Sequence, residues 1–382
     1  MSRLRIAVLF GGRSGEHEVS LVSAASVMHA LDATRYDILP VGIGRDGAWI
    51  CGAGALARLR DGATDTSVDT VSDVRRCILA PDPTLGLLVD DGADGWMPRP
   101  IDVIIPVLHG TFGEDGTMQG LFELAGIPYV GAGVLGSAVG MDKIVQKELF
   151  HAAGLPVVPY IWAYAEECRT STDAVCDRVE ASLAYPVFVK PPNMGSSVGI
   201  SKARTRAELT DALLLAAAYD RTVLVEQAVS APREIEVAVL GAREAIASAP
   251  GEIIPSNEFY DYAAKYVDGA SATIVPADLD ASLAERLRAE ALRAFAAVRC
   301  EGMARVDFLV ARDDGAAYLN EVNTIPGFTS ISMYPKLFAY SGVPYPELLD
   351  RLVALALARA DEVRALRRSY DEGGDWHRDE AR

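Results

Sequence analysis

The sequence is poor in cysteine and contains no long apolar run. Its five cysteines, at positions 51, 77, 168, 176 and 300, include no Cys-x-x-Cys pair, and their number is odd. This pattern argues against a disulfide framework or a zinc cluster and favours a reducing compartment. No segment approaches the roughly 18–20 apolar residues that a membrane-spanning helix needs. Residues 6–10 are apolar but too few for a signal peptide, so we expect a cytoplasmic protein with no membrane partner.

Basic residues are scarce relative to acidic ones. The chain has 36 Lys and Arg against 53 Asp and Glu, which gives a net charge of −17. Proteins that bind nucleic acid or anionic membranes need a basic surface, so the charge argues against nucleic acid as a partner. A local basic pocket for phosphate groups is still compatible with this balance. The length of 382 residues predicts two or three domains.

Strand-like and helix-like segments alternate in the first third of the chain. Residues 6–10 and 101–108 have the composition of buried strands, and residues 20–31 have helical spacing through Val22, Ser26 and Leu31. This alternation predicts an α/β fold with a mostly parallel sheet. We interpret the weakly patterned residues between 45 and 98 as an insertion with short strands. Further helices are predicted at residues 142–153 and 279–299, where apolar residues recur at steps of three and four.

Two later segments predict a hairpin with a polar face. The segments flank Arg-Asp-Asp-Gly-Ala at residues 312–316, which is typical of a hairpin turn. Alternation places Arg305 and Asp307 on one face of the first strand, and Glu321 and Asn323 on one face of the second. If these faces coincide, three oxygen ligands converge beside an arginine, which is the ligand chemistry that Mg²⁺ prefers. An ordinary solvated sheet face is the alternative, and these residues alone leave both open.

A glycine- and serine-rich loop follows Lys190. It runs Gly195-Ser196-Ser197-Val-Gly199 after an apolar strand. Backbone N–H groups and hydroxyls in such a loop suit phosphate, and the lysine adds positive charge. It is not a P-loop, because the sequence contains no Gly-Lys pair. A plain surface loop is the alternative.

Two residues near strand ends are candidates for a cleft. Glu16 follows Gly11-Gly12 at a helix start, where it either stabilises the helix dipole or binds a cationic amine. The dinucleotide fingerprint is absent, because Arg13 stands where a glycine is required. His109 closes the second apolar strand and begins a glycine-rich turn, a common place for ligands in open α/β sheets. A purely structural histidine is the alternative.

Several short motifs follow one another in a single order along the chain. They are GG-x-S-x-E-x-E-V-S, H-G-x-x-G-E-D-G, M-D-K, K-P-x-x-x-G-S-S-V-G, E-Q followed by R-E-I-E-V, K-Y, R-x-D and N-E-V-N-T-x-P-G-x-T-x-x-S. Together they resemble the D-alanine–D-alanine ligases of the ATP-grasp superfamily, from about residue 4 to 360. The resemblance implies three domains, at residues 1–132, 133–226 and 227–382, with a Rossmann-like sheet in the first and ATP between the other two.

The same resemblance implies a reaction in two steps. ATP phosphorylates the carboxylate of one D-alanine to give D-alanyl phosphate and ADP, and the amine of a second D-alanine then displaces phosphate. The dipeptide is a peptidoglycan precursor, and the family is usually homodimeric. The alternatives within the superfamily are D-alanine–D-lactate ligation and another carboxylate–amine ligase. A non-catalytic α/β binding protein with an inter-domain cleft is the alternative from another class.

The resemblance also implies roles for particular residues. Those expected to bind ATP are Lys143, Lys190, Ser196, Ser197, Glu226, the backbone near Val229, Glu234, Lys265 and Asn320. Two Mg²⁺ ions, or Mn²⁺ in their place, are expected at Asp307, Glu321 and Asn323.

A second set of residues is expected to bind the amino acids. Glu16, with His109 nearby, should anchor the ammonium group of the first D-alanine. Ser332 and the Met333 backbone should bind the carboxylate of the second. Arg305 and the backbone N–H of Gly327 should stabilise the oxyanion. In a flap at residues 257–268, Lys265 should cover the phosphates and Tyr266 should hydrogen-bond with Ser196 and Glu16. The Lys-Tyr pair favours a dipeptide product over a D-lactate ester.

Overall fold

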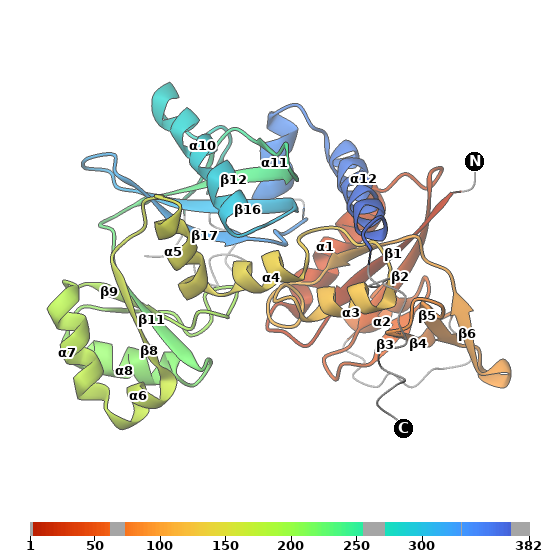
Figure 1. Cartoon of the computed structure of the whole chain (residues 1–382), viewed down its shortest axis with the longest axis horizontal. Helices are drawn as coiled ribbons and strands as arrows, with labels where there is room; N and C mark the ends of the chain where they lie inside the picture. Colours follow the sequence, from red (N-terminus) through yellow and green to blue (C-terminus); the bar gives the residue numbers. More distant parts are fainter. Residues whose placement is uncertain (1–2, 62–72, 255–271, 330, 368–382) are drawn as a thin grey trace, which may run out of the picture.

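Three β-sheets form the framework of the protein (Figure 1). The computed structural model describes residues 3–61, 73–254, 272–329 and 331–367. Strand order is β6-β5-β4-β3-β2-β1-β7 in the first sheet and β10-β9-β11-β8 in the second. In the third it is β15-β14-β12-β16-β17, with β13 paired to β12. The expected α/β class is confirmed.

The first sheet is parallel at one end and antiparallel at the other. β1 (Leu4–Gly11) pairs in parallel with β2 (Tyr36–Ile43) and β7 (Val103–Val107). The segment expected to carry short strands adds β3 (Trp49–Cys51), β4 (Arg75–Leu79), β5 (Leu87–Asp90) and β6 (Trp96–Arg99), all antiparallel. The sheet is therefore mixed and not mostly parallel as expected, because two of its six strand pairings are parallel. Pro106 lies in edge strand β7, a position that tolerates proline because no further strand needs its missing N–H.

Helices pack against the first sheet. They are α1 (His17–Ala30), α2 (Ala55–Arg60) and α3 (Thr117–Ala125), and a short 3₁₀ turn, η1, lies at Gly92–Asp94. The next helix, α4 (Val134–Met141), packs instead against α3 and the third sheet. The C-terminal helix α12 (Tyr345–Arg364) returns to this part of the molecule, and its buried leucines share a core with α1 and β7. The chain between the third sheet and α12 is thereby held beside the loops that follow β1 and β7.

Helices cover one face of the second sheet. Its strands are β8 (Tyr160–Tyr164), β9 (Val187–Lys190), β10 (Ser201–Ala203) and β11 (Thr222–Gln227), covered by α6 (Ala165–Thr170), α7 (Thr172–Ser182) and α8 (Arg206–Ala216). In β9 the side chains alternate: Val187 and Val189 are buried under the helices, whereas Phe188 and Lys190 line the pocket described below.

The third sheet carries the predicted hairpin. Its strands are β12 (Arg233–Gly241), β13 (Ile246–Ala247), β14 (Gly251–Ile254), β15 (Ala272–Ile274), β16 (Gly302–Val310) and β17 (Ala317–Asn323). β16 and β17 pair antiparallel, with Arg305 opposite Asn323 and Asp307 opposite Glu321. The expected coincidence of their polar faces is thus confirmed. The expected helices are α5 (Lys143–Ala152) and α10 (Ala281–Ala297), and α11 (Met333–Tyr340) follows the hairpin.

Candidate active site

One pocket is lined by residues of the second and third sheets and of the loops that follow β1 and β7 of the first sheet. Every predicted site residue that the structure describes lines it: Glu16, His109, Lys143, Lys190, Ser196, Ser197, Glu226, Val229, Glu234, Arg305, Asp307, Asn320, Glu321, Asn323, Gly327, Ser332 and Met333. Lys265 and Tyr266 lie outside the described residues. Segments more than 300 positions apart in the chain therefore meet at a single cavity, as the motif order suggested.

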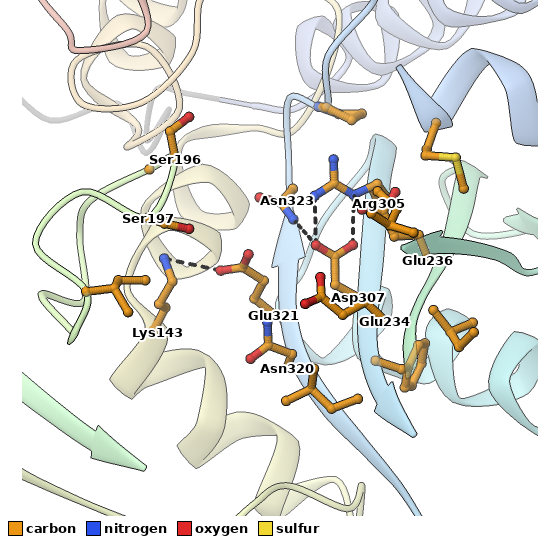
Figure 2. A pocket seen from close by; sticks show the side chains of 18 of the residues that line it. Lys143, Ser196, Ser197, Glu234, Glu236, Arg305, Asp307, Asn320, Glu321 and Asn323 are labelled. Atoms are coloured by element: carbon orange, nitrogen blue, oxygen red, sulfur yellow. Dashed lines mark hydrogen bonds and ion pairs between the residues drawn. The ribbon is translucent and has the colours of Figure 1, made fainter. Parts of the chain in front are cut away.

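Asp307 lies at the centre of a charged network on the hairpin (Figure 2). Arg305 donates to both of its oxygens, at 2.8 and 2.7 Å, and the Asn323 amide donates at 2.9 Å. Arg305 also forms an ion pair of 3.2 Å with Glu236 on β12. Burial alone would lower the pKa of Arg305, but these carboxylates raise it well above its usual value. The guanidinium is thus a fixed positive charge at the pocket wall.

Glu321 is held from the other side by helix α5. Lys143, the first residue of α5, has its Nζ 3.2 Å from Glu321 Oε2 and donates to the Met194 carbonyl at 3.1 Å (Figure 2). Asp142 caps the helix by accepting from the backbone N–H groups of residues 144 and 145. The cap fixes where the helix starts, and so it aims the lysine at the hairpin.

The hairpin offers a suitable donor set for a divalent cation. Asp307 and Glu321 face each other on neighbouring strands, and Asn323 contributes an amide oxygen. Two carboxylates and one amide suit a hard cation that completes its coordination with phosphate oxygens and water. Within the described part of the chain, no cluster of three or more His, Cys, Asp or Glu side chains forms a metal site from protein groups alone. The donor set of two carboxylates and one amide thus fits an ion whose remaining ligands are phosphate oxygens and water.

Glu16 lies close to two glycines of the pocket region, Gly110 and Gly195. Ser196 donates a hydrogen bond to its Oε1. A side chain at Gly110 or Gly195 would collide with Oε2 of the same carboxylate. Ser196 and Ser197 have φ angles of +48° and +59°, in the left-handed region that non-glycine residues rarely adopt. The loop is thus bent so that one serine hydroxyl reaches the carboxylate.

His109 uses both ring nitrogens within the protein. Nδ1 lies 3.2 Å from the Ile325 carbonyl, which can only accept, so Nδ1 carries the proton. Nε2 is then an acceptor for the Ser23 hydroxyl at 3.3 Å, and the Ser23 oxygen accepts from the Phe328 N–H at 3.4 Å. Burial lowers the pKa of His109 and favours this neutral form. His109 therefore fixes the loop that contains Gly327.

The loop after the hairpin is tightly folded around Ser332. The Ser332 hydroxyl accepts from the Thr329 N–H at 3.1 Å and lies 2.8 Å from the Thr329 hydroxyl. A Cβ at Gly327 would come within 2.7 Å of the same oxygen. Glycine therefore lets the backbone approach Ser332 closely, beside Arg305 and Met333 in the pocket lining.

Comparison with known proteins identifies the family. A family model described as D-ala D-ala ligase N-terminus matches residues 5–132, and one described as D-ala D-ala ligase C-terminus matches residues 149–354. The chain belongs to the D-alanine–D-alanine ligase family. It is 51% identical over 362 residues to the D-alanine–D-alanine ligase of Heliobacterium modesticaldum, which covers 95% of this chain and 97% of that relative. It is also 51% identical over 364 residues to the enzyme of Chloroherpeton thalassium, covering 95% and 98%.

Solved structures of this ligase family have the same fold. The D-alanine–D-alanine ligase from Coxiella burnetii aligns with a TM-score of 0.80 at 36% identity, covering 95% of this chain and 97% of that one. The VanG D-Ala:D-Ser ligase from Enterococcus faecalis aligns with a TM-score of 0.81 at 37% identity, covering 93% and 100%. These likenesses confirm the expected ATP-grasp architecture. No helix in the described part of this chain is long and apolar enough to cross a membrane.

Two charged residues near the ligase pocket were not predicted from the sequence. Lys147 is 1% exposed, and its Nζ lies 2.5 Å from Glu226 Oε1. Lys190 lies 2.5 Å from the other oxygen of Glu226. Burial alone would raise the pKa of Glu226, but the two lysines lower it to about 2. Lys147 lies four residues after Lys143 and so on the same helix face, and this spacing was the feature of the sequence that could have pointed to it.

The second such residue is Glu114, in the turn after β7. Its Oε1 accepts from the Gly110 N–H at 2.6 Å, and it lines the pocket near Glu16. Burial, and to a smaller extent the charge of Glu16, raises the pKa of Glu114 to about 8. A neutral carboxyl group at pH 7 thus supports the turn that carries His109. The acidic letters of the G-E-D-G motif were the signal for it in the sequence.

Proposed function

We propose that this protein joins two D-alanines to D-alanyl-D-alanine, with conversion of ATP to ADP and phosphate through D-alanyl phosphate. One observation carries the proposal: a single pocket combines a carboxylate that suits an ammonium group, Glu16, with an arginine and a pair of carboxylates that suit phosphate-bound metal. A carboxylate is a poor electrophile, so the reaction needs a leaving group and stabilisation of negative charge. The product is a precursor for peptidoglycan synthesis.

Family membership implies that ATP and a divalent metal ion are used. We infer that the metal is Mg²⁺, that two ions bind, and that Mn²⁺ can replace them, with Asp307, Glu321 and Asn323 as ligands. The donor set of the hairpin supports this assignment. Bound there, the ions would neutralise phosphate charge and withdraw electron density from the transferred group.

We assign the nucleotide to the part of the pocket between the second and third sheets. Lys143 and Lys190 supply positive charge for its phosphates, with Asn320 beside Lys190 at 3.5 Å. The loop that contains Ser196 and Ser197 supplies backbone donors. Glu226 is assigned as the acceptor for the 6-amino group of adenine, the backbone near Val229 as a further contact to the base, and Glu234 as the contact to the ribose hydroxyls. All three line the same cavity. Lys265 stays a prediction for covering the phosphates.

We assign the two amino acids to the other end of the pocket. The Glu16 carboxylate accepts from the ammonium group of the first D-alanine, and the His109 turn shapes this site. Arg305 and the Gly327 N–H stabilise the oxyanion that forms when the second amine attacks. The Ser332 hydroxyl and the Met333 backbone bind the second carboxylate. Tyr266 stays a prediction for linking the flap to Ser196 and Glu16.

The proposal is tested by ADP release from the purified protein with ATP, Mg²⁺ and a panel of acids. We expect ADP release when D-alanine is the only amino acid added, and none when L-alanine replaces it. D-Lactate tests the ester-forming alternative, and D-serine tests the acceptor named for the Enterococcus faecalis relative. Product mass separates amide from ester. Faster turnover with L-alanine, or with D-lactate as acceptor at neutral pH, would contradict the assignment.

Assembly and location are part of the same proposal. We infer a homodimer that works in the cytoplasm, by resemblance to the family. Light scattering of the purified protein tests the dimer: a mass near twice the 40.8 kDa of the chain is expected.

A further inference from the structure

Lys147 is a buried cation that does not reach the pocket. Its side chain is 1% exposed, and Glu226 and Lys190 line the cavity whereas Lys147 does not. Burying a charge is unfavourable unless a partner of opposite charge lies close. The only carboxylate within ion-pair distance of Lys147, among the described residues, is Glu226. That carboxylate is therefore the direct link between Lys147 and the cavity.

Helix α5 fixes Lys147 relative to the metal-binding hairpin. Gln146 accepts from the Val322 N–H at 2.7 Å and donates to the Val322 carbonyl at 3.3 Å, so its amide pairs with the backbone of β17. Lys143, one helical turn before Lys147, pairs with Glu321 on the same strand. The helix therefore connects the hairpin at one end of the pocket with Glu226 on β11 at the other.

The two lysines that pair with Glu226 differ in how far their side chains can move. Glu226 has one lysine on each oxygen, both at 2.5 Å, so the group carries an excess positive charge. Lys190 also contacts Asn320 and lines the cavity, where it can turn toward an anionic ligand. Lys147 is enclosed and stays with Glu226. When Lys190 turns to the nucleotide, Lys147 is thus the cation that keeps Glu226 ionised.

We propose that Lys147 is a positioning residue that holds Glu226 as an ionised acceptor, and so makes the pocket select adenine over 6-oxopurine bases. The inference rests on the proposed function, in which Glu226 binds the 6-amino group of ATP. An ionised carboxylate can only accept hydrogen bonds, so it binds an amino group and repels a carbonyl oxygen at the same position. A protonated Glu226 would donate to that oxygen and the discrimination would be lost.

The test compares ATP with inosine triphosphate, each with Mg²⁺, by isothermal titration calorimetry on the full chain. We expect the wild type to bind ATP at least tenfold more tightly. In Lys147→Met, ATP should bind more weakly and the preference should fall toward unity. A folded variant that keeps the wild-type preference within twofold would overturn the inference. The titrations contain no D-alanine and need no turnover, so a failed ligase assay would leave this test intact.

A double variant separates action through Glu226 from other effects. In Glu226→Gln, the carboxylate that Lys147 acts on is gone. Adding Lys147→Met to that variant should then change the ratio of the two dissociation constants by less than twofold. A further change of fivefold or more would overturn the inference. The double variant removes both members of the Lys147–Glu226 ion pair, so neither charge is left buried without the other, and it provides a folded test even if Lys147→Met alone does not fold.

Discussion

Replacing Gly195 by alanine should displace Glu16 without disturbing the fold. An alanine Cβ at this position would overlap Oε2 of Glu16 and lie 3.1 Å from its Cδ. The carboxylate must therefore shift by roughly 0.5–1 Å to reach ordinary van der Waals separation. Gly195 does not have a positive φ angle, so alanine can adopt its backbone conformation. The perturbation is confined to the position of one carboxylate.

The size of the effect follows from that displacement. A misplacement of about 1 Å in a positioned substrate lowers the rate by about 100-fold, which corresponds to ~2.7 kcal/mol of transition-state stabilisation. We expect kcat/KM for D-alanine to fall by about that factor. ADP release at varied D-alanine and saturating ATP measures it, and thermal denaturation should show a Tm close to that of the wild type.

Gly15→Ala is the matched control. A Cβ at Gly15 has no atom within 4 Å, so this variant should keep kcat/KM within twofold of the wild type. If Gly195→Ala also stays within threefold, Glu16 is not the anchor of the first D-alanine. If both variants lose activity equally, the steric argument is wrong.

Three further variants test other parts of the site. Glu321→Gln should lower kcat by about 10³-fold, because charge stabilisation at the transferred phosphoryl group is lost. The assay is ADP release, and an unchanged circular dichroism spectrum should show that the variant is folded. A variant that keeps a tenth of the wild-type activity would contradict this prediction. Arg305→Lys should lower kcat by about 10²-fold, since a lysine cannot bridge Asp307 and Glu236 as the planar guanidinium does; a steady-state kcat near that of the wild type would refute this. Glu114→Gln tests the pKa of about 8 for Glu114, whose ordinary value is 4.5. Between pH 4.5 and pH 8, Glu114 binds a proton in the folded wild type but not in the unfolded chain. The free energy of unfolding therefore falls as pH rises in this range, by at most ~1.4 kcal/mol per pH unit. The variant lacks this contribution, so its denaturation midpoint should decline less from pH 5 to pH 8, and parallel profiles would contradict the assignment.

Local patterns predicted the hairpin because its geometry is local. Period-two alternation and a short turn fix which side chains of β16 and β17 share a face. The irregularity between Asp307 and Phe308 leaves Asp307 opposite Glu321 and was not visible in the sequence. The order of the motifs then placed this hairpin, the lysines and the serine loop in one site, which composition or periodicity alone would not have done.

Features that depend on packing between distant elements were harder to predict. Helix spacing pointed to Val22, yet Val22 is 51% exposed, whereas Ser20 and Ser23 are fully buried. Ser20 bonds with the Gly11 N–H and the Val107 carbonyl, so a buried hydroxyl is satisfied where an apolar residue is expected. The partner of Lys147 could not be predicted either. The position of Lys147 in the helix predicts the face on which it lies, but not which carboxylate packs opposite that face.

Isotope transfer tests the central claim most directly, namely that the carboxylate of one D-alanine is activated by phosphorylation. D-Alanine labelled with ¹⁸O in both carboxylate oxygens is turned over with unlabelled ATP, and the released phosphate is analysed by mass spectrometry. One carboxylate oxygen bridges carbon and phosphorus in D-alanyl phosphate, and it leaves with phosphate when the second amine attacks. We predict one ¹⁸O atom in the phosphate per dipeptide formed, whereas phosphate free of ¹⁸O would contradict the account.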